Sequence, residues 1–450
     1  MVALIGASIL LFWLDSSNIS KFILVVLVAG YIVGNRGFAQ FTPVPGIPLL
    51  PGEGALALLA ALTFIEQSRG GLRGWQWRGL DLLIVAWIAL GLGRMFFDGR
   101  TYGILALRDF AMVYYAAFYF AAKIVTQRGE QTASVLLATV RVSAIPMGVL
   151  FMVSQQFPGI FLHNFNFRGV PLIFYKDDLV GLYAAIAAVL HFLRYEERRR
   201  IYSLVFCFCL VALVISTSNR AAMIALFTMA CWVVYSGRWR LAAWLGVGGV
   251  VGAVAVLTVA QVRNESWETT PLFGLYEAVN SLADPTGQGT YRGEETSIKG
   301  DNNLFRWVWW KILISDTWSN APVFGLGFGY DLAAQFEREY FAGAANDFTA
   351  RSPHSIFVTV FARMGIAGLV LFLSIVAWMF HFTAKAARVD HPHLIGAWAG
   401  AWAILASASF GVVMEGPMGA VIFWVLLGIA SAMSEVHDRK IAGDESDGTS

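Results

Sequence analysis

Charged residues are scarce in this chain of 450 residues: aspartate, glutamate, lysine and arginine together make up 14%. Hydrophobic residues make up 57%, which lies outside the usual range of soluble proteins. The apolar residues come in long blocks and not at the period of an amphipathic helix or strand, and such blocks are typical of membrane spans. The composition therefore excludes an ordinary soluble domain and predicts an integral membrane protein.

Cysteine is also rare, with three residues that all fall inside apolar runs: Cys207, Cys209 and Cys231. This placement excludes an extracytoplasmic disulfide framework, and the spacing matches no metal site. We expect the three side chains to serve packing. The chain also lacks internal repeats, so a repeat architecture is not expected.

Long apolar runs predict transmembrane helices, because a lipid-embedded backbone must satisfy its own hydrogen bonds and about 20 residues are needed to cross. The first run is short and lacks a basic leader, so no cleavable signal peptide is expected. With one short run tilted, interfacial or re-entrant, about twelve or thirteen crossings are expected. The fold class is therefore an all-α, polytopic transmembrane helix bundle, forming a single integral membrane domain over residues 1–450. The runs lie at 1–14, 21–34, 46–66, 79–97, 102–125, 132–156, 172–193, 201–217, 219–235, 240–262, 355–382, 393–414 and 416–434.

Lysine and arginine clusters place one side of this bundle in the cytoplasm by the positive-inside rule. The richest cluster is 194–200, and Arg238 falls on the same side if the spans alternate. The long polar segment 263–353 then lies on the opposite, extracytoplasmic side. The polar tail 435–450 is expected to be cytoplasmic and disordered.

Residues 263–353 form the one long polar stretch, and loops of this length in compact proteins are usually functional or disordered. Residues 304–313 combine apolar and basic side chains, as a helix on a membrane surface does. A second short helix is expected at 331–341. Residues 284–303 are rich in Gly, Thr, Asp and Glu, which is typical of a mobile loop. We therefore expect an extracytoplasmic loop that contains short helices.

Basic side chains stand at the mouths of spans on the loop side. Arg168 precedes one span, and Arg220 sits in a polar hinge between two others. His354 ends the long loop, three residues after Arg351, and Arg306 is a further loop arginine. A charge near the membrane interior costs ~2.5–3.5 kcal/mol, so its retention needs a reason. Guanidinium groups pair with phosphate oxygens through two parallel hydrogen bonds, which makes these arginines candidates for holding a pyrophosphate. The alternative for each alone is a snorkelling or solvated, salt-bridging charge.

His354 is the candidate general base. An ordinary imidazole pKa of ~6.5 suits removal of a proton from a sugar hydroxyl at neutral pH. Neighbouring arginines would lower the pKa and keep the ring neutral, as a base requires. The alternative is a histidine that only caps the following helix. No second histidine or carboxylate lies nearby at ligand spacing, so we expect no metal and no cofactor.

Other polar features carry weaker expectations. The glycine-rich segment 322–329 lacks the spacing of a nucleotide-binding loop and is interpreted as a tight turn between loop helices. Arg108 and Asp109 are interpreted as an ion pair within a span. Arg363 is expected to line the cavity or to pair inside the bundle. Asp178 and its acidic neighbour lie near the outer mouth and could position acceptor hydroxyls.

Four short stretches, taken in order around the long loop, carry a family resemblance. They are Arg168-Gly169 before a span, Ser218-Asn219-Arg220-Ala221 opening another, Phe305-Arg306-Trp307 with 322–329, and Pro353-His354-Ser355 followed by Gly365-Ile366-Ala367-Gly368. With these stretches the chain resembles the O-antigen ligase and polymerase superfamily of bacterial envelope glycosyltransferases, from about residue 165 to 370. One departure is Asn219, where the family often has serine.

The resemblance implies a GT-C-like bundle and a metal-independent, inverting transfer of a glycan from undecaprenyl pyrophosphate to an acceptor sugar hydroxyl. Arg168 and Arg220 would hold the donor pyrophosphate, and His354 would deprotonate the acceptor. Arg306 and Arg351 would support the two arginines. The protein would lie in the bacterial inner (cytoplasmic) membrane with its active site facing the periplasm. Its partners would be a lipid-linked oligosaccharide, an acceptor glycan, membrane lipid and a chain-length regulator protein, with no nucleic acid.

Two alternatives stay open. Polymerisation of an exopolysaccharide or O-antigen is favoured over ligation to lipid A core only because such polymers are made in many envelopes, since the motifs do not separate the two reactions. A secondary transporter or lipid-linked-glycan flippase would also give a dozen spans with buried arginines. That class predicts repeat symmetry and ionisable groups near the bilayer centre. Here the candidate groups cluster outside, beside one asymmetric loop.

Overall fold

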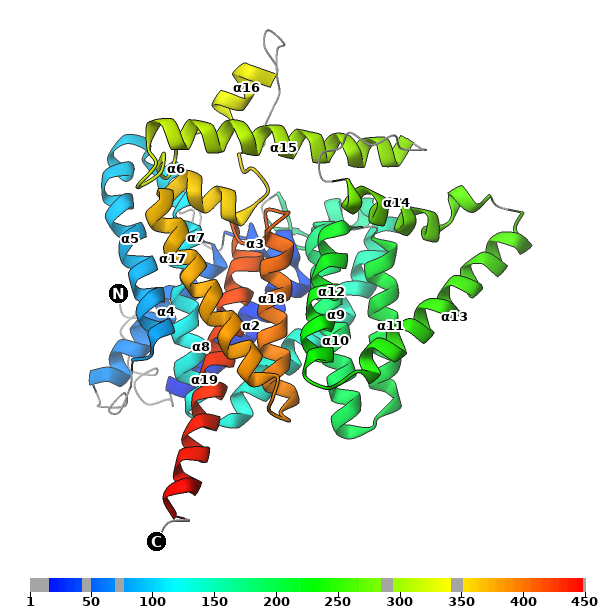
Figure 1. Cartoon of the computed structure of the whole chain (residues 1–450), viewed down its shortest axis with the longest axis horizontal. Helices are drawn as coiled ribbons and strands as arrows, with labels where there is room; N and C mark the ends of the chain where they lie inside the picture. The colour runs from blue at the N-terminus through cyan, green and yellow to red at the C-terminus, as the bar shows by residue number, and fades with distance from the viewer. Residues whose placement is uncertain are drawn as a thin grey trace.

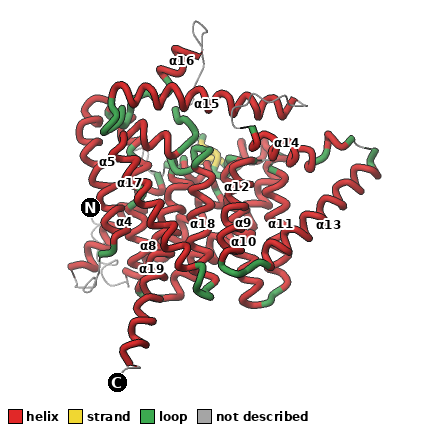
Figure 2. The backbone as a smooth tube through the Cα atoms, in the orientation of Figure 1, coloured by secondary structure: helices red, strands yellow, loops and turns green. Residues whose placement is uncertain are grey.

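The computed structural model describes residues 16–42, 50–68, 77–167, 169–217, 219–264, 266–284, 294–340 and 351–447. The first expected span, at 1–14, lies outside these residues. Within them the chain is almost entirely helical, as the tube in Figure 2 shows. One two-stranded antiparallel sheet is present, formed by β1 (Asn166–Phe167) and β2 (Val170–Pro171). The all-α prediction is confirmed.

The helices stand mostly side by side, with a further group lying across one end (Figure 1). The first half of the chain contains α2 (Ser16–Val33), α3 (Asn35–Ala39), α4 (Pro51–Ser68), α5 (Gly79–Tyr102), α6 (Ile104–Asp109), α7 (Ala111–Tyr114), α8 (Ala117–Gln127), α9 (Glu130–Gln156), the π-helix η1 (Ile160–Asn164), α10 (Asp177–Arg198) and α11 (Ile201–Ser216). The second half contains α12 (Arg220–Tyr235), α13 (Arg240–Val262), the 3-10 helix η2 (Trp267–Thr269), α14 (Pro271–Ala283), α15 (Glu294–Asn320), α16 (Ala334–Tyr340), α17 (Ile356–Ala386), α18 (Pro392–Ala408) and α19 (Pro417–Asp447).

Seven helices among the described residues are long and apolar enough to cross a membrane. They run over Gly79–Tyr102, Ile104–Gln127, Gln131–Gln156, Asp177–Arg198, Arg240–Val262, Ile356–Ala386 and Pro417–Arg439. This confirms a multi-pass membrane protein. Three shorter apolar helices, Asn18–Val33, Ile201–Ser216 and Arg220–Tyr235, and the 17-residue α18 belong to the same bundle. The count of twelve or thirteen crossings stays a prediction, because at 1.5 Å per residue a 16-residue helix measures only about 24 Å.

Two helices form the centre of the bundle, and one helix leaves it. The most apolar windows of α10 and α19 are 83% and 89% buried, whereas that of α13 is 0% buried. Small residues let the central helices approach closely. A Cβ on Gly181 of α10 would lie 2.5 Å from Ala222 of α12, and a Cβ on Gly428 of α19 would lie 2.4 Å from the Tyr119 carbonyl oxygen. Helix α13 diverges from the bundle in Figure 1 and exposes apolar side chains all round.

The described residues of 266–340, which we call the cap, lie across one end of the bundle (Figure 1). The helix expected at 304–313 is part of the longer α15, and the one expected at 331–341 is α16. The segment 284–303 is not a continuous mobile loop, since α15 already begins at Glu294. Helix α19 continues to Asp447, within the range where a disordered tail is expected.

A buried ionic cluster joins three helices towards the opposite end. Lys123 of α8 lies 2.6 Å from Asp81 of α5 and 2.6 Å from Glu435 of α19. Asp81 also accepts a hydrogen bond of 2.7 Å from the Tyr119 hydroxyl. A buried charge of this kind is tolerated because each partner is paired and hydrogen-bonded. The cluster links α5, α8 and α19 and was not singled out from the sequence.

Candidate active site

His354 lies two residues before α17 and is held from the side of the cap. Its φ of 58° is in the left-handed region, which costs a non-glycine residue about 1–3 kcal/mol and persists only where surrounding contacts impose it. The indole Nε1 of Trp310 donates to the Pro353 carbonyl oxygen at 2.5 Å. The ring of Trp309 meets the imidazole edge-on, with centroids 6.3 Å apart. Two tryptophans of α15 therefore fix the backbone and the ring of this segment.

A buried carboxyl fixes the same segment from the side of the bundle. Glu415, between α18 and α19, accepts hydrogen bonds from the Ser352 hydroxyl at 2.5 Å and the Thr359 hydroxyl at 2.7 Å. The Ser352 oxygen in turn accepts from the His354 backbone N–H at 3.3 Å. Burial raises the pKa of Glu415, while the two hydroxyl donors oppose that rise. Glu415 thus sets the position of the strained turn without touching the imidazole ring.

The imidazole lies in an environment that favours its neutral form. Its Nδ1 atom is buried and has no hydrogen-bond partner in the part of the chain that the structure describes. Burial lowers the pKa of His354 to about 4, and the charges of Arg306 and Lys176 act in the same direction. Asp178 opposes them. At neutral pH the ring is therefore uncharged and able to accept a proton.

Arg306 lies within electrostatic reach of this imidazole, and a second arginine, Arg220, lies within reach of Arg306. Arg306 comes from α15 of the cap, and Arg220 is the first residue of α12. Burial lowers the pKa of Arg306 to about 10, and the like charge of Arg220 contributes to this shift. Two guanidinium groups within electrostatic reach repel each other, and a bound anion would relieve that repulsion. The structure therefore brings together Arg220, Arg306 and His354, which are distant in the sequence.

Local capping explains how Arg220 is presented. The side chain of Asn219 caps α12 by accepting from the backbone N–H groups of Ala221 at 2.9 Å and Ala222 at 3.2 Å. Asparagine and serine are about equally good at this position, so the departure from serine preserves the cap. Arg220 Nη1 donates to Asn303 Oδ1 at 2.5 Å, which connects α12 to the cap.

Lys176 and Asp178 complete the group, which we call the outer cluster: Lys176, Asp178, Arg220, Arg306 and His354. Lys176 Nζ lies 2.7 Å from Asp178 Oδ2 at the start of α10. The sequence suggested Asp178 only as an aid to acceptor binding, and Lys176 was missed. A signal was present, since a lysine and two aspartates stand together at the start of a span on the same side as His354.

The remaining predicted site residues are placed differently. Arg351 is close enough to Arg363 of α17 for its charge to act on that residue. Arg168 lies outside the described residues, although β1 and β2 on either side of it pair just ahead of α10. The candidate donor-binding set that the structure brings together therefore consists of Arg220 and Arg306, with Lys176 added.

The glycine-rich turn 322–329 fits into a break in α17. At Gly365 the helix has a non-helical φ of 65°. The Ile366 N–H, freed by the break, donates to the Pro322 carbonyl oxygen of the turn at 2.8 Å. A Cβ on Gly365 would lie 2.4 Å from the backbone of the turn, and one on Gly325 would lie 2.4 Å from the backbone of α17. The turn 322–329 and the break at Gly365 thus fit against each other and join the cap to the bundle. We call this contact the interlock.

Arg363 secures this interlock. Its Nη1 donates to the carbonyl oxygens of Gly327 at 3.0 Å and Tyr330 at 2.6 Å, and its Nη2 lies 2.8 Å from Asp109 Oδ2. Asp109 therefore pairs with Arg363 and not with its neighbour Arg108, whose side chain is exposed. The expectation that Arg363 pairs inside the bundle is met, and the one for Arg108 was wrong.

Gly365→Ala is expected to lower the thermal stability of the purified protein. The left-handed φ alone costs alanine about 1–3 kcal/mol, and the added methyl group collides with the turn. Thermal unfolding in detergent, followed by tryptophan fluorescence, measures the shift. Gly93→Ala is the matched control, because a Cβ there meets nothing within 4 Å. Equal melting temperatures for the two variants would contradict the interlock.

No group of three or more His, Cys, Asp or Glu residues that could hold a metal ion occurs within the described ranges. The side chains of the outer cluster offer anion binding by guanidinium and ammonium groups, and proton transfer by a neutral imidazole.

Comparison with known families supports the resemblance. Residues 204–373 match the family model described as O-antigen ligase. This stretch contains Arg220, Arg306, Arg351 and His354, together with both halves of the interlock. Comparison with curated proteins finds no match. The matched region extends over α11 to the middle of α17, so it covers the cap and the helices that hold it.

Proposed function

We propose that this protein, whose residues 204–373 match the O-antigen ligase family model, is a metal-independent, inverting glycosyltransferase of the bacterial inner membrane. It takes a glycan from undecaprenyl pyrophosphate and transfers it to an acceptor sugar hydroxyl at the periplasmic face, building an O-antigen or exopolysaccharide. The observation that carries the proposal is the outer cluster, where a neutral imidazole lies within the electrostatic reach of Arg306 and Lys176, and Arg306 in turn lies within that of Arg220.

The donor pyrophosphate is the anion that this cluster suits. Arg220 and Arg306 carry like charges in a partly desolvated site, so an oligoanion between them relieves their repulsion. As the bond from the anomeric carbon to the phosphate oxygen breaks, negative charge grows on the departing pyrophosphate. Fixed guanidinium groups stabilise that charge more in the transition state than in the ground state. Lys176 lies near enough to His354 to contribute at the same site.

The acceptor hydroxyl is the group that His354 deprotonates. Because Nδ1 is buried, Nε2 is the nitrogen that accepts the proton. The hydroxyl oxygen attacks the anomeric carbon on the face opposite the pyrophosphate, the new glycosidic bond forms as the old bond breaks, and the configuration inverts. The tryptophans of α15 beside the turn limit access of water, which would otherwise hydrolyse the donor.

The test is a transfer assay with purified protein in lipid nanodiscs. The donor is a polyprenyl-pyrophosphate oligosaccharide, supplied alone or with lipid A core, and products are identified by mass spectrometry. Longer lipid-linked glycans from donor alone support polymerisation, and glycan on lipid A core supports ligation in its place. In vesicles, movement of unaltered donor across the bilayer would support the flippase and contradict the enzyme.

Arg220→Ala and Arg240→Ala form the matched pair of variants for this assay. Arg240 is an exposed arginine at the start of α13, outside the outer cluster. Loss of transfer in the first variant with retention in the second is expected. Equal activity would remove the donor-binding role of Arg220.

The pH profile of transfer tests the imidazole separately. A base must be unprotonated, so activity is expected to be full above the pKa of His354, about 4, and to fall as the pH drops through it. Lys176→Gln removes a charge that lowers this pKa, so its acid limb should move to higher pH. Asp178→Asn removes the opposing charge and should move the limb to lower pH.

The measurement is kcat/KM as a function of pH for wild type and both variants. Opposite shifts in the two variants are the signature of electrostatic control of one group. Shifts of the same sign, or an acid limb unaffected by either change, would contradict His354 as the titrating base.

A further inference from the structure

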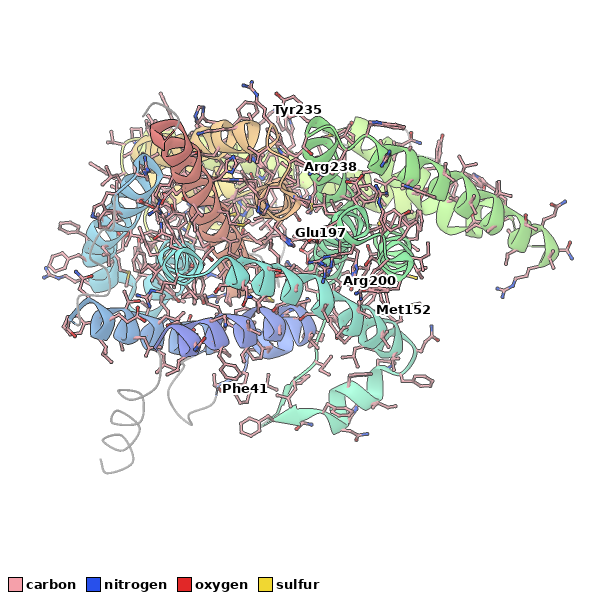
Figure 3. The ribbon with its side chains drawn as sticks, turned by 90° about the horizontal axis from the view of Figure 1, so that it is seen from below. Phe41, Met152, Glu197, Arg200, Tyr235 and Arg238 are labelled. Atoms are coloured by element: carbon pink, nitrogen blue, oxygen red, sulfur yellow. The ribbon has the colours of Figure 1, made fainter. Side chains whose placement is uncertain are left out.

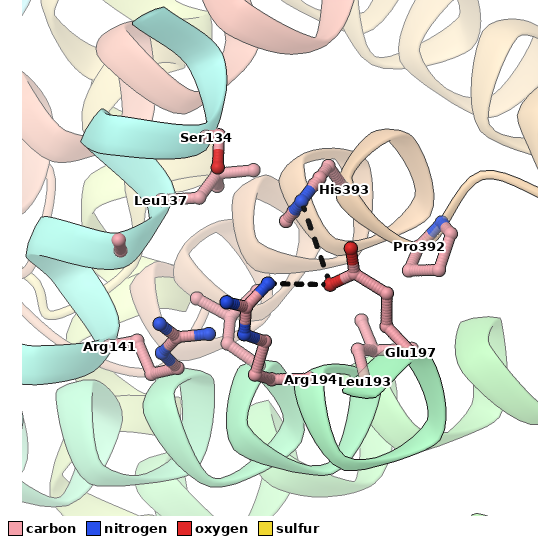
Figure 4. A pocket seen from close by; sticks show the side chains of 10 residues that line it. Ser134, Leu137, Arg141, Leu193, Arg194, Glu197, Pro392 and His393 are labelled. Carbon is pink, nitrogen blue, oxygen red and sulfur yellow. Dashed lines mark hydrogen bonds and ion pairs between the residues drawn. The ribbon is translucent and has the colours of Figure 1, made fainter. Parts of the chain in front are cut away.

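A second polar site lies at the end of the bundle opposite the cap. Here a cavity of about 80 Å³ opens between α9, the last turns of α10 and the start of α18 (Figure 4). Its polar lining consists of Arg141, Arg194, Glu197, His393 and Ser134. Figure 3, which views the molecule from below and so from the side opposite the cap, labels Glu197 near the end of α10. The volume has room for several water-sized groups, and so for a phosphate.

The side chains that line this cavity include more cationic than anionic groups. Arg194 Nη1 lies 2.8 Å from Glu197 Oε2, and His393 Nε2 lies 4.0 Å from the same oxygen. Arg141 points into the cavity in Figure 4 and is not joined to Glu197. The Nε atoms of Arg141 and Arg194 are both buried without a hydrogen-bond partner in the described part of the chain. The cavity therefore contains two guanidinium groups and one carboxylate, and this carboxylate is already paired with Arg194.

The position of Arg141 in an apolar helix makes this imbalance costly. It belongs to the span Gln131–Gln156, at the level where α10 ends and α18 begins. An arginine inside a span costs ~2.5–3.5 kcal/mol on insertion scales, and such residues normally pair with one another, with backbone or with a ligand. An anion in the cavity would supply the missing acceptor for Arg141.

The side chains around the cavity indicate which kind of molecule the anion belongs to. Val135 and Val142 of α9, which follow the lining residues Ser134 and Arg141 in the sequence, are 40% and 52% exposed. Apolar side chains exposed next to a polar cavity suit acyl chains next to a headgroup. Basic pockets between transmembrane helices on the cytoplasmic side bind anionic lipid headgroups, and the positive-inside rule predicts that this end is cytoplasmic.

We propose that this cavity binds a phosphate group through Arg141 and Arg194, and that an anionic phospholipid supplies it. The phosphate oxygens accept hydrogen bonds from both guanidinium groups, while the acyl chains lie along the exposed apolar face of α9. The bound lipid would join α9, α10 and α18, which pack around the buried centre of the bundle. The site is separate from the outer cluster and does not depend on glycosyl transfer.

The test is lipid binding to the delipidated full-length protein, followed by native mass spectrometry. The probes are phosphatidylglycerol, phosphatidylcholine and inorganic phosphate. We expect phosphatidylglycerol to bind most tightly, and Arg141→Gln to weaken its binding at least about tenfold, as loss of a paired charge-assisted contact would. Arg388→Gln is the control, since Arg388 is an exposed arginine at the same end of the bundle but does not line the cavity.

The following results of the binding measurements would contradict the proposal. Equal phosphatidylglycerol binding by wild type and Arg141→Gln would overturn the site, as would equal weakening by Arg388→Gln. Saturation by inorganic phosphate with no gain from phosphatidylglycerol would overturn the lipid source. If Arg141→Gln does not yield folded protein, Arg194→Gln serves as the second variant, with the same expected loss.

Discussion

His354→Ala is expected to lower the turnover of glycan transfer by about 10²–10⁴-fold, the range that a general base contributes. The imidazole is neutral near pH 7, because burial and the nearby cations lower its pKa to about 4. Alanine removes the proton acceptor and leaves Arg220 and Arg306 in place, so donor binding should change little. The measurement is kcat and KM in the nanodisc assay, with KM for the donor nearly constant.

Two further variants separate chemistry from folding. His163→Ala is the matched control, since His163 is an exposed histidine in η1, between α9 and α10. His354→Gly relieves the left-handed strain at this position and leaves space for an imidazole molecule. Added imidazole is expected to restore part of its activity. Turnover in His354→Ala within a factor of two of wild type would remove the general-base role.

Arg363→Leu is expected to destabilise the protein by about 3–5 kcal/mol, the cost of breaking a buried ion pair by removing one partner. The change leaves Asp109 without its cation and removes the donor to the carbonyl oxygens of Gly327 and Tyr330. The glycine-rich turn should then separate from α17. Denaturant or thermal unfolding in detergent measures the loss.

The double variant Arg363→Leu/Asp109→Leu tests whether the pair is the cause. Removing both charges should recover part of the stability, because no uncompensated charge is left. Recovery should be incomplete, since the Gly329 N–H also donates to Asp109 at 2.9 Å. Arg108→Gln, at the exposed neighbouring position, should change stability by less than about 0.5 kcal/mol. A double variant less stable than Arg363→Leu alone would show that the two side chains do not act as a pair.

Much of the fold could be predicted because membrane spans follow from local composition. The spans expected at 79–97 and 240–262 lie within α5 and α13, and the one expected at 355–382 begins one residue before α17. A lipid-embedded backbone has few alternatives to a helix, so a long apolar run is nearly sufficient evidence. The start of α15 at Glu294 was missed, since Gly, Thr and Asp lower the helix propensity of this segment.

The candidate site could be predicted only in part, because contacts between distant segments leave no local pattern. His354 and Arg220 stood out as isolated polar groups beside apolar runs. Glu415 did not, although it hydrogen-bonds Ser352 across 63 positions of sequence. The pairing of Asp109 with Arg363 was likewise beyond local reasoning, since an adjacent arginine offered a simpler partner. These contacts depend on how α17 packs against the cap in the tertiary structure, and the local sequence does not encode that packing.

The break in α17 has a consequence for exchanging parts between related proteins. Since the backbone of 322–329 completes the hydrogen bonding of the broken helix, the external segment and the span that follows it form one unit. A chimera that takes its outer region from one relative and residues 356–386 from another would join two surfaces that were not shaped together. Swaps meant to alter acceptor choice should therefore carry both segments.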